Sequence, residues 1–203
     1  MDTDCKFKRA KFIDSSIEVR EMFHFAKPSE TLKAIQVKCC DSYGSMLWLL
    51  QSETAESFFK SWNTAVKLVW NVPRDTYTYL TEGYFGKGFH PLRNQVLGRY
   101  PSFFQKLLNS PSKEVALLAR IVGRDPRSVT FKNLKYVDKL AGLSPWDFSS
   151  KRIKVNLPVK SVPDNELWRT RMLDTLIDMR QKTYLMVEDS QHISAMISSL
   201  CNT

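Results

Sequence analysis

Apolar residues three and four positions apart recur through most of this 203-residue sequence, and this spacing constrains the fold more than any other feature. Sustained alternation of apolar and polar residues, which is typical of half-buried strands, is rare. The clearest helical pattern follows Ser52, a suitable N-cap, and stops before Pro73. One face of this helix carries the apolar residues Ala55, Phe58, Phe59, Trp62, Val66 and Val69. The sequence therefore predicts a mostly α fold.

Other helical patterns fill most of the remaining chain. One begins near Pro91, ends at Ser110, and presents the apolar residues Leu92, Val96, Tyr100, Phe103, Phe104 and Leu107. Shorter patterns, each bounded by Pro, Gly, Ser or Asp, cover residues 6–24, 29–39, 43–50, 112–122 and 131–141. We expect these helices to pack into one bundle-like body over residues 1–143.

The C-terminal part of the chain has a different pattern. Residues 144–163 combine prolines with the basic residues Lys151, Arg152 and Lys154, which predicts an extended basic linker. A pair of helices is then expected at about 165–186 and 190–201, with Asp164 as the cap of the first helix. The sequence thus predicts a final helical region over residues 164–203.

Composition limits the class of protein. Hydrophobic residues make up 43% of the sequence and aromatic residues 12%, which is enough to build a packed core. The N-terminus lacks an apolar core and no run of 18 apolar residues occurs, so we expect neither a signal peptide nor a membrane span. The four cysteines and three histidines form no zinc-ligand spacing. We therefore expect reduced thiols, no bound metal, and a location in the cytoplasm and nucleus.

Motifs that would carry catalysis fail on residue type or spacing. Residues 136–139, Tyr-Val-Asp-Lys, place a lysine where a polymerase would have its second metal-binding aspartate. The glycine cluster at residues 83–88 lacks the spacing of a phosphate-binding loop, so we interpret it as a flexible loop between helices. His24, expected in the core or at its boundary, and His90 lack the neighbours of a catalytic triad. The sequence predicts no catalytic residue and no cofactor.

Positive charge is concentrated in one region of the chain. There are 30 basic and 21 acidic residues, and the net charge of +9 favours polyanionic partners. Residues 111–162 contain 11 basic and 4 acidic residues, whereas residues 163–203 are acidic by two. Two rows recur at helical spacing, although Pro126 should end the first helix before the last arginine of its row. With the basic residues of the linker, the candidate phosphate-binding residues are Arg120, Arg124, Arg127, Lys132, Lys135, Lys139, Lys151, Arg152 and Lys154.

Two further features bear on nucleic-acid binding. A smaller basic patch near the N-terminus contains Lys6, Lys8, Arg9 and Lys11, and for each basic patch a solvated charged surface is the alternative interpretation. Trp62 and Trp70 lie in an amphipathic helix, so we expect them in the core. Trp146 and Trp168 flank the basic linker and are the better candidates for stacking on bases.

Short motifs over nearly the whole chain resemble one family. They include residues 43–48 (Tyr-Gly-Ser-Met-Leu-Trp), 61–67 (Ser-Trp-Asn-Thr-Ala-Val-Lys) and 70–74 (Trp-Asn-Val-Pro-Arg). Further matches are Arg99-Tyr100, Phe103-Phe104, Leu107-Leu108, Ser110-Pro-Ser112, Glu114-Val115, Val122-Gly123-Arg124-Asp125, Trp168-Arg169 and the terminal Ser-Leu-Cys. In their order and spacing, these motifs resemble the region downstream of the polymerase domain in non-LTR, LINE-type retrotransposon reverse transcriptases.

The resemblance implies part of an RNA-directed DNA polymerase rather than a complete enzyme. In that family the catalytic aspartates precede the region that resembles this chain, and no residue here matches the palm or endonuclease carboxylates. Residues from about 5 to 42 would correspond to the thumb or its exit, and the rest to the C-terminal extension. The implied partners are RNA or DNA and the remainder of a retrotransposon polyprotein. A helical protein-interaction module derived from a mobile element is the alternative hypothesis.

Overall fold

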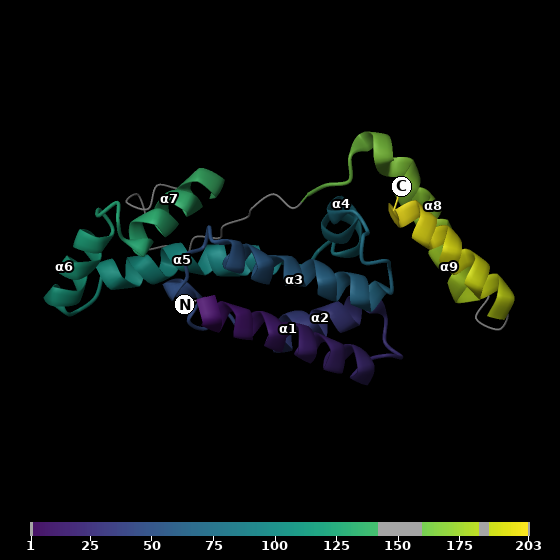
Figure 1. The fold of residues 1–203 in the computed structure, drawn as a ribbon, viewed down its shortest axis with the longest axis horizontal. Helices are drawn as coiled ribbons and strands as arrows, with labels where there is room; N and C mark the ends of the chain where they lie inside the picture. Colours follow the sequence, from purple (N-terminus) through teal and green to yellow (C-terminus); the bar gives the residue numbers. More distant parts are fainter. Residues whose placement is uncertain (1, 142–159, 183–186, 203) are drawn as a thin grey trace. The chain divides into compact units, whose positions relative to one another are not determined.

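The computed structural model describes residues 2–141, 160–182 and 187–202 of the chain. Helices and their connecting segments account for these residues, and no β-strand occurs among them (Figure 1). The predicted mostly α fold is therefore confirmed. Within the same ranges, no helix is both long enough and apolar enough to cross a lipid bilayer.

The helices lie mostly where apolar spacing predicted them. Their bounds are α1 Asp2–Met22, α2 Pro28–Lys38, α3 Glu53–Trp70, α4 Thr78–Leu80, α5 Leu92–Leu108, α6 Lys113–Val122, α7 Val129–Ala141, α8 Leu167–Lys182 and α9 Val187–Asn202. Two 3₁₀ turns, η1 at Ser45–Leu47 and η3 at Asp164–Glu166, and one π-helical turn, η2 at Thr81–Phe85, complete the order.

The ends of α3 follow from local chemistry. The Ser52 hydroxyl accepts a hydrogen bond from the Ala55 N–H at 3.2 Å, which confirms the predicted N-cap. The helix ends at Trp70, since Asn71 adopts a left-handed φ of 52° just before Pro73. Helix α3 therefore begins directly after its cap, Ser52, and ends directly before Asn71.

Two local predictions are wrong. Residues 43–50 form only the short turn η1, because Gly44 has a left-handed φ of 79° and Trp48 is extended. Asn133 then bonds this extended backbone: its amide donates to the Trp48 carbonyl at 2.7 Å and accepts from the Leu50 N–H at 2.9 Å. Asp164 begins η3 rather than capping α8, which starts three residues later.

Contacts divide the chain into two compact units. Unit 1 contains residues 2–15, 37–62 and 90–141, and unit 2 contains residues 16–36, 63–89, 160–182 and 187–202. Helices α1 and α3 each supply residues to both units. The linker predicted at residues 144–163 falls largely outside the described residues, so the boundary expected there stays a prediction.

Aromatic side chains fill the core of unit 1. Phe58 of α3 is 1% exposed and packs edge-on against Phe12 and Trp48, with ring centroids 6.5 and 5.1 Å away. The Trp48 indole N–H donates a hydrogen bond to the Asp4 carboxylate at 2.8 Å. Trp62 is buried as predicted. Helices α6 and α7 both pack against α5, so both helices belong to unit 1 (Figure 1).

Unit 2 contains the antiparallel pair α8 and α9, which pack side by side (Figure 1). The buried apolar residues of this pair are Leu173, Leu176, Ile193, Ile197 and Cys201. Unit 2 also contains residues 16–36 and 63–89, and in the second of these ranges the Trp70 indole donates to the Phe85 carbonyl at 3.0 Å. Trp70 is half-buried, so the prediction that it lies in the core holds only in part.

Candidate nucleic-acid interface

The α6–α7 segment, residues 113–141, combines a net positive charge with a well-defined backbone. It contains seven basic and three acidic residues. Helix α6 begins at Ser112, whose hydroxyl accepts from the Val115 N–H at 3.3 Å and contacts the Glu114 carboxylate at 2.6 Å. The bond from Ser112, together with the backbone N–H of Glu114 itself, holds the pKa of Glu114 below its usual range, so this carboxylate stays ionised at the positive end of the helix.

A single serine joins the two helices of this segment. The Ser128 hydroxyl donates to the Val122 carbonyl at the end of α6, and it accepts from the Phe131 N–H at the start of α7 at 2.9 Å. Asp125 adds a second local bond, since its carboxylate accepts from the Arg127 N–H at 3.0 Å. The turn at residues 123–128 is therefore fixed by side-chain bonds at both of its ends.

Every candidate phosphate-binding residue in the described part of the chain is exposed to solvent. Lys132, Lys135 and Lys139 lie on one face of α7 and are exposed. On the other helix only Arg120 lies within α6, because the helix ends at Val122. The expected helical row therefore does not continue to Arg124 and Arg127, which are exposed in the turn instead. The result is one row on α7 beside a cationic turn.

The described structure gives less support to the basic residues of the linker and of the N-terminal patch as a binding surface. Lys151, Arg152 and Lys154 lie outside the described residues. In the N-terminal patch, Lys8 pairs with Asp41 at 2.9 Å, so part of its charge is neutralised. The same ion pair and the Tyr43 N–H lower the pKa of Asp41. The N-terminal patch is therefore weaker as a phosphate-binding surface than the α6–α7 segment.

The glycines of residues 83–88 allow close packing of backbone. Residues Thr81–Phe85 form η2, so the interpretation of the whole cluster as a flexible loop is wrong for its first half. A Cβ atom at Gly83 would lie 2.4 Å from the Lys160 carbonyl oxygen, and one at Gly86 would lie 2.5 Å from the Thr81 carbonyl oxygen. Both positions thus require glycine for steric reasons within unit 2.

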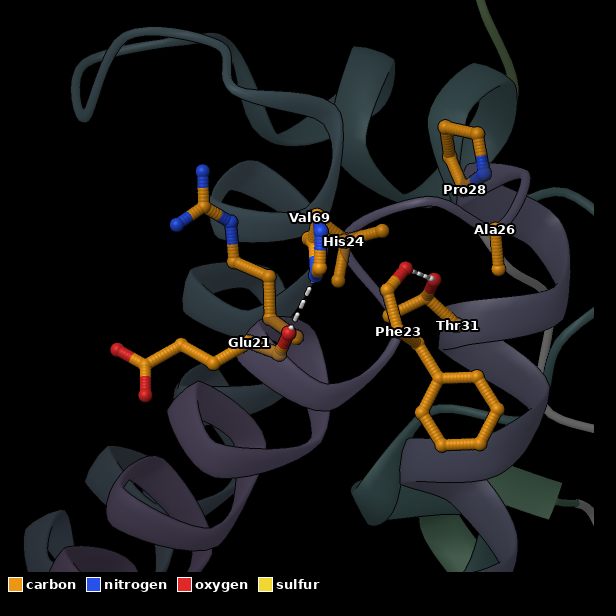
Figure 2. Close-up of a pocket in the computed structure, with 8 residues that line it drawn as sticks. Glu21, Phe23, His24, Ala26, Pro28, Thr31 and Val69 are labelled. Carbon is orange, nitrogen blue, oxygen red and sulfur yellow. Dashed lines mark hydrogen bonds between the residues drawn. The ribbon is translucent and has the colours of Figure 1, made fainter.

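A pocket of about 320 Å³ lies at the turn between α1 and α2 (Figure 2). Its lining residues are Arg20, Glu21, Phe23, His24, Ala26, Pro28, Thr31 and Val69. His24 is exposed rather than in the core, and its Nδ1 lies 2.9 Å from the Glu21 carbonyl oxygen, while the Glu21 carboxylate points away from the ring (Figure 2). The Thr31 hydroxyl lies within hydrogen-bonding reach of backbone carbonyls. These polar groups stabilise the turn rather than facing one another as a catalytic set.

Burial holds the thiols of Cys40 and Cys201 in their neutral form. All four cysteines, which lie within the described residues, carry thiols rather than disulfides, and three of them are buried. Burial raises the pKa of the Cys40 thiol to about 11 despite a hydrogen bond with Gln95, and burial also raises the pKa of Cys201. Because the thiolate is the nucleophilic form, both thiols are poor nucleophiles near neutral pH. Within the described ranges, no cluster of His, Cys, Asp and Glu is placed to hold a metal ion.

Replacing Ser128 with alanine should lower the free energy of unfolding by about 1–2 kcal/mol, because α7 loses its N-cap and the Val122 carbonyl loses a donor. Urea unfolding followed by circular dichroism measures this change. Ser128→Thr retains the hydroxyl and should recover most of the stability. Equal losses for the two variants would contradict a capping role for the hydroxyl.

Comparison of the chain with protein-family models, curated proteins and solved structures finds no match. Function is therefore inferred from the chain itself. The α6–α7 segment, with its exposed cationic side chains and its fixed turn, is the feature of the described structure best suited to bind a ligand of defined charge.

Proposed function

We propose that this chain is a non-catalytic part of a retrotransposon-type RNA-directed DNA polymerase, and that its α6–α7 segment binds the phosphates of RNA or DNA. The observation that carries the proposal is the grouping of exposed basic side chains on one segment of unit 1. These residues are Arg120, Arg124, Arg127, Lys132, Lys135 and Lys139. A nucleic acid would contact them through its backbone, so binding would be independent of sequence.

The segment suits this task because its backbone is ordered before any ligand binds. Bonds of Ser128 and Asp125 fix the turn, and the three lysines of α7 share one face. Less conformational freedom is then lost on binding than with a disordered basic tail. Among the described residues, Lys132, Lys135 and Lys139 form no ion pair with a carboxylate, so no such pair must break before phosphate binds.

The polymerase setting rests on the ordered motifs that resemble retrotransposon reverse transcriptases. In this setting, the rest of the polyprotein supplies the catalytic carboxylates, and the present chain holds template or target strands near them. A protein with these duties would work in the cytoplasm, where element RNA is translated, and in the nucleus, where target DNA lies. The chain itself would then need no cofactor.

Salt dependence of binding tests the proposal. A fluorescein-labelled single-stranded RNA should bind at low salt, and its dissociation constant should rise steeply as salt increases, because binding releases counterions from phosphates. With four to six phosphate contacts, we expect affinity to fall on the order of 50- to 300-fold between 50 and 200 mM salt. Fluorescence anisotropy measures the dissociation constant at each salt concentration. Absence of binding at low salt, or a dissociation constant that does not change with salt concentration, would refute the proposal.

A matched pair of variants locates the binding surface. Alanine at Arg120, Arg124, Lys132 and Lys135 should weaken binding and flatten its salt dependence without unfolding the chain, because all four side chains are exposed. The control variant places alanine at Lys33, Lys38, Lys60 and Lys87, which are also exposed and change the net charge equally. Equal losses in both variants would mean that total charge, rather than the α6–α7 segment, determines affinity.

A further inference from the structure

Helix α6 presents three large apolar side chains that are each more than half exposed to solvent. Leu117 and Leu118 are each 59% exposed and Ile121 is 57% exposed. Apolar spacing predicted a helix at residues 112–122, but it does not predict what covers these three side chains. Only Ala119, on the opposite side, is buried where α6 packs against α5.

The three exposed residues form one continuous strip. Successive residues of an α-helix turn by about 100°, so Leu117, Leu118 and Ile121 fall within a sector of about 100°. Scattered apolar residues are normal on protein surfaces, but a contiguous strip marks a binding surface. We name these three residues the α6 strip. Their spacing of three and four matches the anchors by which one helix packs against another.

Positively charged residues beside the α6 strip favour a partner helix that carries negative charge. Lys113 and Arg120 lie next to Leu117 around the helix, on the side away from Leu118, and both are exposed. Arg124 extends this basic edge into the turn. A partner helix with leucines facing the strip and carboxylates along one edge would satisfy both features.

An anionic membrane fits the same surface less well. Glu114 lies in the same sector as the strip, one turn before Leu118, and it is ionised and exposed. Anionic lipid would be repelled by a carboxylate in the middle of the apolar face. A partner helix can instead place a basic or polar residue opposite Glu114.

We infer that the α6 strip is a docking surface for an acidic amphipathic helix of a partner protein. This interaction goes beyond nucleic-acid binding and does not depend on it. Because Arg120 and Arg124 would serve both ligands, the partner helix and RNA should compete. The interaction would therefore release nucleic acid when the partner binds.

A synthetic probe tests the docking surface on the whole chain. The probe is a fluorescein-labelled helical peptide of about 16 residues, with leucines at positions i, i+3, i+4 and i+7 and glutamates along one edge. We expect saturable binding, about tenfold or more weaker for the variant Leu117→Ser with Ile121→Ser. The control variant, Val37→Ser with Leu47→Ser, removes two exposed apolar side chains elsewhere in unit 1 and should bind normally.

Further measurements separate the alternatives. A peptide with lysines in place of glutamates should not bind, and unlabelled acidic peptide should displace RNA from the native chain. Equal binding by the acidic and basic peptides, or by the native chain and the Leu117/Ile121 variant, would overturn the inference. Two other outcomes would also overturn it: strip-dependent binding to phosphatidylserine vesicles without peptide binding, and strip-dependent self-association in sedimentation without peptide binding. Peptide binding can succeed while RNA binding fails, so this test is distinct from that of the proposed function.

Discussion

Replacing Asn133 with alanine is expected to lower the free energy of unfolding by about 2–5 kcal/mol. The side chain is 0% exposed, and it bonds the Trp48 carbonyl and the Leu50 N–H, residues more than 80 positions earlier in the chain. Alanine would leave both backbone groups buried without this partner, at a cost of about 1–3 kcal/mol each. Urea unfolding followed by tryptophan fluorescence measures the loss.

Two variants of the same helix sharpen this experiment. Asn133→Leu restores most of the lost volume but no hydrogen bond, so we expect it to remain strongly destabilised. Lys132→Ala, at the neighbouring exposed position, should change the free energy of unfolding by less than about 0.5 kcal/mol. If leucine restored stability, packing volume rather than backbone bonding would be the role of Asn133.

The contacts of Asn133 also explain why apolar spacing wrongly predicts a helix at residues 43–50. The spacing at residues 43–50 fits a helix, yet Tyr43 and Leu47 are 86% and 65% exposed, while Trp48 and Leu50 are buried. A distant asparagine bonds the Trp48 carbonyl and the Leu50 N–H, so neither of these backbone groups needs a partner within a helix. Local periodicity carries no information about a partner that lies 83 residues away.

Helices were predictable where local signals decide the structure. The helix after Ser52 was predictable because a cap, an apolar face and a terminating proline agree with one another. The turn η2 was not, because its glycines are needed for contacts with backbone such as that of Lys160, which no local pattern reveals. The α6 strip shows a third situation, since an apolar helical face predicts a helix but not what covers it.

The basic region was predictable for a simpler reason. Long cationic side chains are almost always exposed unless they are paired, so the positions of Lys132, Lys135 and Lys139 on one face of α7 followed from their spacing. The turn was not predictable in the same way. Its shape depends on Ser128, whose hydroxyl bonds two helices at once, and a lone serine gives no sign of such a role in the sequence.

In unit 2, one buried arginine connects several elements. Arg169 is 5% exposed; its Nε donates to the Glu166 carboxylate at 2.7 Å, and a terminal nitrogen donates to the Leu200 carbonyl at 2.8 Å. Leu200 lies in the last turn of α9, where backbone carbonyls lack partners within the helix. The guanidinium also lies 5.7 Å from the Tyr77 ring and 5.2 Å from the Trp168 ring. Trp168, a candidate for base stacking, therefore has a partner within unit 2.

Arg169→Ala should therefore destabilise unit 2 by about 2–4 kcal/mol, because one substitution removes a largely buried ion pair, a helix C-terminal donor and two ring contacts. Arg169→Lys keeps the charge but cannot reach all of these groups in the same planar geometry, so its loss should be intermediate. Arg171→Ala, two residues along the same helix and exposed, is the matched control and should cost less than about 0.5 kcal/mol. Hydrogen exchange resolves the effect, since protection of the last turn of α9 should fall in Arg169→Ala while that of α7 in unit 1 is unchanged. Unchanged protection of that turn would show that Arg169 does not stabilise the end of α9.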